Sequence, residues 1–595
     1  MNYLVVFDSK NLIKFLKKNS KDNLVIICAD NLELDSEIVT GVDILRLRNF
    51  PDEESKLSCL NFTNSYLNKE NVELVDISIN NIYEYFVLPL NKLLYLIREN
   101  VKKDDKIILF GGNSKVKLPL FYGVKTAEFP RNFFIERADV FNPFLYEALN
   151  DKNNVHYYQD SIFRVSIKYF LRLLSLFTIT YGGTLIKYIV GVIRTINMAK
   201  SSCDLPRLIL PVRSNTQFDF ADSITKFLHY NDSKVKPVIL YYEMLTGKNY
   251  LSRVLSHPTE VTSLFNFRDL PYVLLYPVLL VVDVIKSLIK NREYRKINLG
   301  FSNYKYSLDI NILKLDAFSS AHVSLYNGLL GRYLARIRKK NANDFSLLST
   351  EMLGQQAFIE RYCSDKHNVR FYNVQTCAVS DTYYPVKVVG NKTFCLSELD
   401  AKSFNEKGMN NFGNAEYIGD LKYLDSSVNN IFDVNLTTIL FGTQPYEVEQ
   451  SIDLLKIIIK IKPSETNVVI RLHPRDSKKN YTEFINDYDV TFDSDTLKTS
   501  LVNASLLVTR TSSIIYDAVQ YGVPFVSCLL SDFDRSVEMD LLKYEEFTIN
   551  EPREIMEIMC NYKDYFDLQK LMLTKKDISK LSDSSILYNL ESDFL

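Results

Sequence analysis

Short apolar runs that end abruptly in polar residues recur along this chain. Four of them lie at 3–7, 24–28, 42–47 and 106–110, and stretches with helical spacing separate them. Runs of this length, rich in Val, Ile and Leu, are typical of parallel strands buried on both faces. The alternation predicts an N-terminal α/β unit over residues 1–150.

The same pattern returns in the middle of the chain. An apolar run at 207–212 ends in Arg213 and Ser214, and a helical pattern follows at about 220–229. Further strand-like runs lie at 345–349, 369–374 and 393–396, and mainly helical, apolar stretches lie at about 150–205 and 245–300. We therefore expect a second α/β domain, with helical insertions, at 151–425.

A third block shows the alternation most regularly. Strand-like runs at 437–442, 468–471, 488–492, 506–509 and 524–528 surround helical patterns at 447–461 and 514–521. This predicts a Rossmann-like domain at 430–570, followed by a tail or helix at 571–595. The expected fold is α/β and GT-B-like. Two Rossmann-type domains would face each other across a cleft, and the N-terminal half would carry the helical insertions.

Polar residues follow three strands of this third block. In an open parallel sheet, ligands bind beyond the carboxyl ends of the strands. Ser512 and Ser513 precede the helix at 514–521, where backbone N–H groups and the helix dipole favour an anion. Each group alone also fits an ordinary helix cap. Together they predict a nucleotide-phosphate site made of Thr443, Gln444, Arg471, His473, Pro474, Arg510, Thr511, Ser512 and Ser513.

Composition narrows the class of protein. The 595 residues carry a formal net charge of -1, which gives no electrostatic reason to expect nucleic acid. The eight cysteines form no CxxC pair, so neither a zinc site nor a disulfide framework is predicted. We read Asp493-Ser494-Asp495 as a cap or turn rather than a metal site, and expect no metal. The chain begins directly in a strand-like run, without the pattern of a secretory signal, so we expect a cytoplasmic protein.

Two apolar stretches raise the question of a membrane. Residues 270–289 are about long enough to span a bilayer, but Pro277, Asp283 and Lys286 interrupt them. Residues 170–193 are similarly interrupted. Buried core helices are the simpler interpretation. One alternative is helices that lie at the cytoplasmic face of the inner membrane, with Lys and Arg reaching lipid phosphates. True spanning is the other.

His473-Pro474 and Thr511-Ser512-Ser513 carry a resemblance to a known class. They resemble the C-terminal domain of GT-B glycosyltransferases that build bacterial surface polysaccharides, including polysialyltransferases and other nonulosonic-acid or Kdo transferases. The resemblance implies that His473 contacts the donor phosphate and stabilises the leaving group, and that Ser512 and Ser513 bind the same phosphate. Many relatives have Gln-His-Gly where this chain has Gln375-Thr376-Cys377, so no role is carried over there.

The implied reaction is transfer of a sugar from a CMP-activated donor to a surface glycan of a capsule or lipopolysaccharide. The sugar would be a nonulosonic acid: sialic-acid-like, pseudaminic, legionaminic or Kdo. The resemblance implies an inverting, metal-independent enzyme with no cofactor beyond the nucleotide sugar, and a glycan or lipid-linked glycan as acceptor. Three alternatives stay open: a UDP- or GDP-sugar transferase or CDP-polyol phosphotransferase, a non-catalytic scaffold, and a sugar-nucleotide epimerase of GT-B fold.

Sugar transfer also needs a base for the acceptor hydroxyl, which we expect from the N-terminal half. The acidic-acidic-Gly motif of the polysialyltransferase-like families is absent from the sequence. Glu351, after the strand-like run at 345–349, is the first choice as catalytic base. The alternatives are Asp219, Asp222, Glu243 and His322. Arg213 and Ser214 are expected to bind substrate on this acceptor side, because a guanidinium matches a carboxylate or phosphate.

Overall fold

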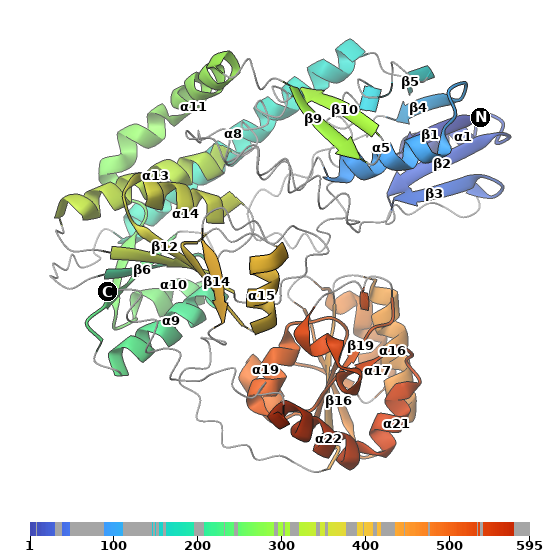
Figure 1. The fold of residues 1–595 in the computed structure, drawn as a ribbon, viewed down its shortest axis with the longest axis vertical. Coiled ribbons are helices and arrows are strands. Elements are labelled where there is room, and N and C mark those ends of the chain that lie inside the picture. The colour runs from blue at the N-terminus through green and yellow to red at the C-terminus, as the bar shows by residue number, and fades with distance from the viewer. Residues whose placement is uncertain are drawn as a thin grey trace.

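The fold is seen in a computed structural model (Figure 1). It describes residues 1–6, 9–29, 39–47, 88–110, 145–146, 149, 154–158, 162–195, 207–230, 233–242, 248–290, 296–301, 304–309, 321–340, 345–350, 355–375, 390–396, 398–407, 413–417, 435–444, 447–473, 476–488, 490–531, 534–535 and 539–575. Three parallel sheets follow one another along the chain, so the predicted α/β class and GT-B-like type of fold are confirmed. That two domains face each other across a cleft stays a prediction.

The first sheet is five-stranded and wholly parallel, with the order β3-β2-β1-β4-β5. Its strands are β1 (Asn2–Val6), β2 (Leu24–Ala29), β3 (Asp43–Leu47), β4 (Lys106–Phe110) and β5 (Asn154–Tyr158), and its described helices include α1 (Ser9–Leu16) and α5 (Leu88–Asn100). Because β5 pairs with β4, the first sheet extends past the boundary that we placed at residue 150.

The middle sheet has seven parallel strands in the order β14-β13-β12-β11-β6-β7-β8. They are β6 (Arg207–Val212), β7 (Lys236–Tyr241), β8 (Glu260–Ser263), β11 (Phe345–Ser349), β12 (Arg370–Val374), β13 (Lys392–Cys395) and β14 (Asn414–Tyr417). Its direction of growth reverses between β6 and β11, which lie side by side. Such a reversal leaves a crevice at the carboxyl ends of the two strands, where α/β proteins bind ligands.

Helices connect and cover the middle sheet. They are α8 (Ile162–Thr195), α9 (Asn215–Tyr230), α10 (Lys248–Leu255), α11 (Leu270–Lys290), α13 (Ala321–Lys340), α14 (Gln355–Lys366) and α15 (Glu398–Lys407). An antiparallel hairpin of β9 (Lys296–Phe301) and β10 (Tyr304–Asp309) follows α11. The predicted helical insertions at 150–205 and 245–300 therefore consist mainly of α8 and α11, but the second also holds α10, β8 and most of β9.

The third sheet has the order β17-β16-β15-β18-β19-β20. Its strands are β15 (Thr438–Gly442), β16 (Asn467–Arg471), β17 (Val490–Phe492), β18 (Leu506–Thr509), β19 (Phe525–Cys528) and β20 (Thr548–Ile549). Alternate residues of β15 enter different cores: Ile439 and Phe441 lie in one, and Leu440 lies in the other. The order reverses between β15 and β18, so their carboxyl ends are the expected ligand site of this domain.

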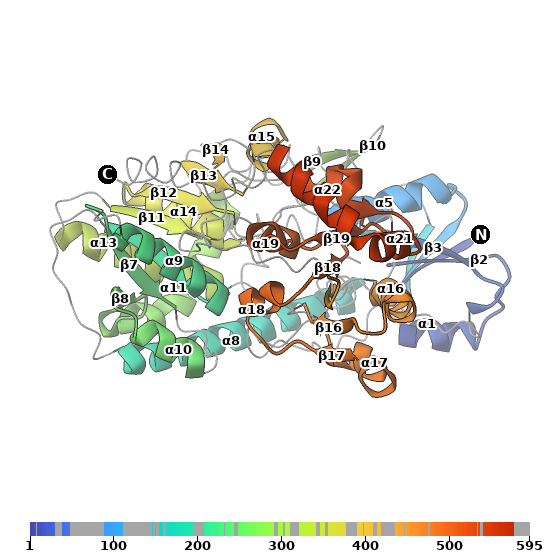
Figure 2. The same ribbon diagram turned by 90° about the horizontal axis from the view of Figure 1, so that it is seen from below.

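Helices pack on both faces of the third sheet. They are α16 (Val448–Ile461), α17 (Thr482–Asp487), α18 (Leu497–Val502), α19 (Ile514–Tyr521), α21 (Glu554–Cys560) and α22 (Tyr562–Lys575). Figures 1 and 2 show α16 and α19 on opposite sides of the strands. The last helix, α22, packs against the third sheet: the side chain of Gln569 accepts a hydrogen bond from the N–H of Phe525 in β19 and donates one to its C=O.

The two apolar stretches that we took for buried core helices prove to be only half buried. Inner positions of α11 such as Val273 and Leu280 are at most 1% exposed, whereas Val278 and Ile289 on its other side are 61% and 63% exposed. In α8, Ile193 is 65% exposed. The interpretation as core helices is therefore wrong for their outer faces. Among the described residues, no helix combines the length and the apolarity needed to cross a membrane.

Candidate functional site

The three predicted strand ends meet at one edge of the third sheet. Strand β15 lies between β16 and β18, and Gly442 is in register with both Arg471 and Thr509. Because all three strands are parallel, the residues that follow them emerge side by side at the reversal point of the sheet. A hydrogen bond of 3.1 Å from Gln444 Nε2 to Thr511 Oγ1 directly links the ends of β15 and β18. The three strand ends therefore lie side by side, and the binding of a nucleotide phosphate at this edge stays a prediction.

The backbone at His473 is held by the neighbouring strand end. Thr443 is 2% exposed, and its Oγ1 accepts a hydrogen bond of 2.9 Å from the N–H of His473. The N–H of Thr443 in turn donates to the C=O of Arg471 at 3.0 Å. A hydroxyl on β15 therefore fixes where the chain leaves β16. Pro474, which we predicted to line the phosphate site, lies outside the described residues.

A buried carboxylate supports the far side of the same loop. Asp476 is 4% exposed, and its carboxylate accepts hydrogen bonds from the N–H of Ser477, the amide of Asn480 and the hydroxyl of Tyr481. Burial, together with this neighbouring carboxylate, raises the pKa of the fully buried Tyr481, so the phenol stays protonated and donates. The C=O of His473 also accepts a hydrogen bond of 2.8 Å from the N–H of Asp476. Both backbone polar groups of His473 are therefore fixed, the N–H by the hydroxyl of Thr443 and the C=O by the backbone of Asp476.

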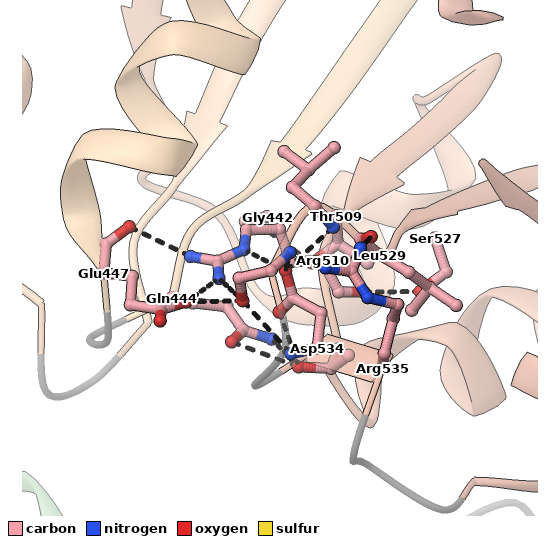
Figure 3. A network of polar contacts seen from close by, with 12 residues as sticks. Gly442, Gln444, Glu447, Thr509, Arg510, Ser527, Leu529, Asp534 and Arg535 are labelled. Atoms are coloured by element: carbon pink, nitrogen blue, oxygen red, sulfur yellow. Dashed lines mark hydrogen bonds and ion pairs between the residues drawn. The ribbon is translucent and has the colours of Figure 1, made fainter. Parts of the chain in front are cut away.

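Arg510 lies at the centre of a buried ionic network behind β15 and β18 (Figure 3). The residue is 1% exposed, and its Nε donates to Asp534 Oδ2 at 2.9 Å. Its terminal nitrogens donate to the C=O and carboxylate of Glu447 and to the hydroxyl of Ser531. The guanidinium is thus held by protein groups, which differs from our prediction of a direct phosphate contact. It is placed to position the strand ends instead.

The sequence analysis did not identify Asp534 and Ser531, which both bind Arg510, as part of the site. Asp534 is fully buried, and it also accepts hydrogen bonds from the N–H groups of Leu530 and Ser531 at 3.0 and 3.2 Å. Burial raises the pKa of the Asp534 carboxyl, while the adjacent Arg510 guanidinium opposes that shift. Thr511 Oγ1 lies 3.4 Å from Asp534 Oδ1, so the network reaches the predicted phosphate-binding residues.

Glu447 adopts an unusual backbone conformation at the start of α16. It is the N-cap of that helix and has a φ of 45° and a ψ of 54°, in the left-handed region that disfavours side chains other than Gly and Asn. Its carboxylate accepts hydrogen bonds from Arg510 and, at 2.6 Å, from Ser531 Oγ. The ionic network therefore coincides with a strained backbone position three residues beyond Gln444, a combination that is common beside functional sites.

A helix begins directly after Ser512 and Ser513, as predicted. Helix α19 begins at Ile514, and Ser513 is its N-cap without a side-chain capping hydrogen bond. Ser512 Oγ lies 3.5 Å from the N–H of Ile514. Both serines are partly exposed, whereas Arg510 beneath them is buried. The two hydroxyls and the positive end of the helix dipole thus lie together at the end of β18.

The guanidinium of Arg471 lies next to the end of β17, the strand on the opposite side of β16 from β15. Its guanidinium pairs with Asp493, donates to Ser500 Oγ at 3.0 Å and to the C=O of Asp495 at 3.3 Å. Asp493 also accepts from the N–H of Asp495 at 2.9 Å, which is the turn that we read from the sequence. Among the described residues there is no group of three His, Cys, Asp or Glu side chains that could hold a metal ion.

On the middle sheet, Arg213 and Ser214 follow β6 at the reversal point beside β11. Arg213 forms an ion pair with the fully buried Glu360, and its guanidinium stacks on the ring of Tyr242 at 4.6 Å. Ser214 acts as a cap for α9, because its Oγ accepts from the N–H of Gln217 at 3.3 Å. Both positions fit the predicted edge of the sheet, but these contacts are structural.

The candidate bases fall into two groups. Glu351, Glu243 and the side chain of His322 lie outside the described residues; the last described residue of the Glu351 segment is Thr350, directly after β11. Asp219 pairs with Arg253, and Asp222 pairs with His257 at 3.0 Å and with Lys226 at 3.0 Å. Asp219 and Asp222 therefore already neutralise basic side chains in this structure.

A pocket of about 950 Å³ lies on the middle domain, but at the wrong end of the sheet for a Rossmann-type ligand site. It is lined by Lys236 and Glu260, the first residues of β7 and β8, and by Asp222 and His257. The N–H of Thr259 donates to Nδ1 of His257 at 3.2 Å, so Nε2 carries the proton that is donated to Asp222. We assign no role to this pocket.

Comparison with known protein families gives a match over part of the chain. A family model described as "Alpha-2,8-polysialyltransferase (POLYST)" matches residues 254–508, which is less than half of the chain. The match runs from α10 to the last strand residues of β18 and includes His473. It supports glycosyltransferase activity. No curated protein matches the chain.

Several solved structures are similar at low identity. UGT71G1 from Medicago truncatula, complexed with UDP-glucose, has 12% identity and a TM-score of 0.41, with 66% of this chain and 98% of that chain covered. A glycosyltransferase from Rickettsia africae has 10% identity and a TM-score of 0.41, with 66% and 98% covered. UDP-GlcNAc 2-epimerase from Methanocaldococcus jannaschii has 12% identity and a TM-score of 0.37, with 62% and 99% covered. The fold assignment itself rests on the three parallel sheets described above.

Proposed function

We propose that the protein transfers a nonulosonic acid, a sialic-acid-like sugar or Kdo, from a CMP-activated donor to a bacterial surface glycan. The observation that carries this proposal is the meeting of the Thr443, His473 and Ser512–Ser513 strand ends at the reversal point of the third sheet. The family match over 254–508 supports it, because it includes two of those three strand ends.

The chemistry of transfer assigns a role to each group. Departure of CMP leaves a phosphate with developing negative charge, which hydrogen-bond donors fixed beforehand stabilise best. His473 would donate to that phosphate, with its backbone held by the Thr443 hydroxyl and by the N–H of Asp476. Ser512, Ser513 and the start of α19 would bind the same phosphate, while Arg510 keeps the strand ends in place. Glu351 remains our candidate for the base that activates the acceptor hydroxyl.

A test of this site is nucleotide binding by thermal shift with CMP, CDP, UDP and GDP. A ligand that binds only the native state stabilises it in proportion to the logarithm of its concentration over its dissociation constant. We expect CMP to raise Tm, and the His473→Ala variant to lose most of that increase. His229→Ala, a change of the same type at an exposed position on α9, is the matched control and should respond like wild type.

The remaining outcomes separate the alternatives. A larger response to UDP, GDP or CDP would replace the CMP proposal with a transferase for that donor. Release of CMP from CMP-sialic acid in the presence of a polysialic acid acceptor, absent in His473→Ala, would support transfer itself. Nucleotide binding by wild type without any release would favour a scaffold. Conversion of a UDP-sugar to its epimer without an acceptor would favour an epimerase.

A further inference from the structure

Helix α11 presents two apolar faces, although a helix on the surface of a protein normally has one. The inner face consists of Val273, Tyr276, Leu280 and Val284, which are all at most 2% exposed. The outer face, here called the α11 outer face, consists of aliphatic residues that are 40–63% exposed: Leu274, Leu275, Val278, Leu279, Val281, Val282, Ile285 and Ile289. Eight large apolar side chains in one continuous stripe exceed the scattered exposure that is usual for a soluble surface.

Neighbouring elements fix which way this face points. Tyr181 of α8 donates a hydrogen bond of 2.9 Å to the C=O of Val273, and its ring stacks on Tyr276. At the start of the helix, the buried Asp269 forms a two-pronged ion pair with Arg336 of α13, with both distances 2.7 Å. The helix is therefore anchored from two sides, and the exposure of its outer face is a fixed property of the fold. Figure 1 shows α11 at the edge of the molecule, away from the third domain.

The most exposed charged residues beside the α11 outer face are basic. Within the described part of α11 and the turn before it, the exposed charged residues are Arg268 and Lys286, one near each end of the helix. Neither side chain has an ion-pair partner among the described residues. The acidic residues are less exposed: Asp269 is 1% exposed and paired, and Asp283 is partly exposed. Next to Arg268, the ring of Phe267 is 70% exposed.

This combination matches the needs of one kind of partner. An aliphatic stripe flanked by an exposed aromatic ring and basic side chains is the pattern of a helix that lies in the plane of a bilayer surface. Lys and Arg at such a helix interact with the phosphates of anionic lipids, and their long side chains reach the headgroups. Because the inner face of α11 is packed against the protein, the outer face would rest on the surface of the bilayer.

We propose that the α11 outer face docks the protein on a membrane surface that contains anionic phospholipids. Membrane docking goes beyond the proposed function, because it depends on α11 and not on the nucleotide site of the third domain. It would bring the protein to acceptors that are carried on lipids. The two inferences stand or fall separately: loss of docking would leave CMP binding intact, and loss of CMP binding would leave docking intact.

The test is flotation of the full-length protein with vesicles of phosphatidylethanolamine and phosphatidylglycerol in a 3:1 ratio. We expect wild type to float with these vesicles and to bind phosphatidylcholine vesicles much less. The triple variant Leu275→Gln, Val278→Gln and Val282→Gln should lower the membrane partition coefficient about tenfold or more, since three side chains that would enter the lipid become polar. Glutamine keeps a high helix propensity, so α11 should be retained.

Two further variants complete the design. Val502→Gln, Met556→Gln and Leu571→Gln change three exposed apolar helix residues of the third domain and form the matched control, which should float like wild type. The pair Arg268→Glu and Lys286→Glu leaves the aliphatic stripe intact, and should weaken binding to the anionic vesicles only. Far-UV circular dichroism and CMP-dependent thermal shift would show that every variant is folded.

Other results would overturn the proposal. One is absence of wild-type flotation, and another is equal flotation of wild type and the triple α11 variant. Equal binding to phosphatidylcholine would remove the commitment to anionic lipid. Concentration-dependent self-association in sedimentation velocity, abolished in the triple variant and unaccompanied by flotation, would mean that the α11 outer face joins two copies of the chain.

Discussion

The Arg510→Leu variant should strongly destabilise the third domain, more than the loss of a ligand-binding side chain at the surface would. The residue is 1% exposed and binds Asp534, which is completely buried, as well as Glu447 and Ser531. Removing the guanidinium leaves the Asp534 carboxylate buried without its counter-charge. Breaking a buried pair in this way costs about 3–5 kcal/mol. A surface pair would cost about 1 kcal/mol or less.

The structure supplies an internal comparison. The Glu447 side chain is 35% exposed, so its attraction to Arg510 is screened by water. Glu447→Gln keeps the shape and one acceptor oxygen, and should therefore cost about 1 kcal/mol or less. The double variant Arg510→Leu with Asp534→Leu removes both buried charges together. It should recover part of the loss seen in Arg510→Leu alone, because no unpaired charge is left behind.

Native-state amide hydrogen exchange is the suitable assay, since it reports the opening of one region in a chain that has several domains. A loss of about 3–5 kcal/mol corresponds to about 10²- to 5 × 10³-fold faster exchange of the slowest amides in β18 and β19. Amides of the first sheet serve as the control and should exchange as in wild type. Acceleration of less than about tenfold in Arg510→Leu, or equal effects of Arg510→Leu and Glu447→Gln, would refute the reasoning.

Three further predictions follow from individual contacts. Thr443→Val removes the hydroxyl that accepts from the N–H of His473, and should lower kcat/KM for CMP release about 10- to 100-fold with the fold retained; unchanged kinetics would argue against this positioning role. Burial would raise the pKa of Asp222, but hydrogen bonds from neighbours including His257 outweigh it and hold the pKa below its ordinary value. Asp222→Asn should therefore reduce Tm at pH 7, and the difference from wild type should begin to shrink as the pH falls below about 4 and vanish only below the lowered pKa of the folded state. Gly328→Ala places a methyl group 1.7 Å from a tyrosine hydroxyl of α11, and should cost about 1–3 kcal/mol in thermal unfolding; a wild-type Tm would show that the tyrosine moves freely aside.

Strands with a continuous apolar run were the part of the fold that could be predicted from sequence. The run at 345–349 is β11, 106–110 is β4, and the helix at 514–521 is α19. Strand β8, with the sequence Glu-Val-Thr-Ser, has no such run because it lies at the edge of its sheet and none of its residues is buried. Strand β20 has only two residues and is likewise an edge strand, in the third sheet. Edge strands of this kind carry little hydrophobic signal.

The candidate site was predictable to the same extent. Its position came from strand ends, which the apolar runs locate, and the structure places Thr443, His473 and Ser512 together. The function of each side chain needed its partners. Arg510 looked like a phosphate ligand because its partner Asp534 follows 24 residues later, after another strand, and no local spacing links the two. The left-handed backbone of Glu447 is likewise invisible in a sequence that offers Glu rather than Gly at that position.

The two central strands of the middle sheet are far apart in the sequence, and this separation has a consequence for synthesis on the ribosome. The pairing of these strands joins Ile209 of β6 to Leu347 of β11, and α11, the hairpin and α13 are all made between them. At about 5–20 residues per second, roughly seven to twenty-eight seconds pass between the synthesis of β6 and that of its neighbour β11. During that interval the edge of β6 that pairs with β11 has no partner strand, and α11, once synthesised, lacks its contacts with the later helix α13. We therefore expect ribosome-bound chains that end before β11 to recruit chaperones, and chains that extend beyond β14 to release them.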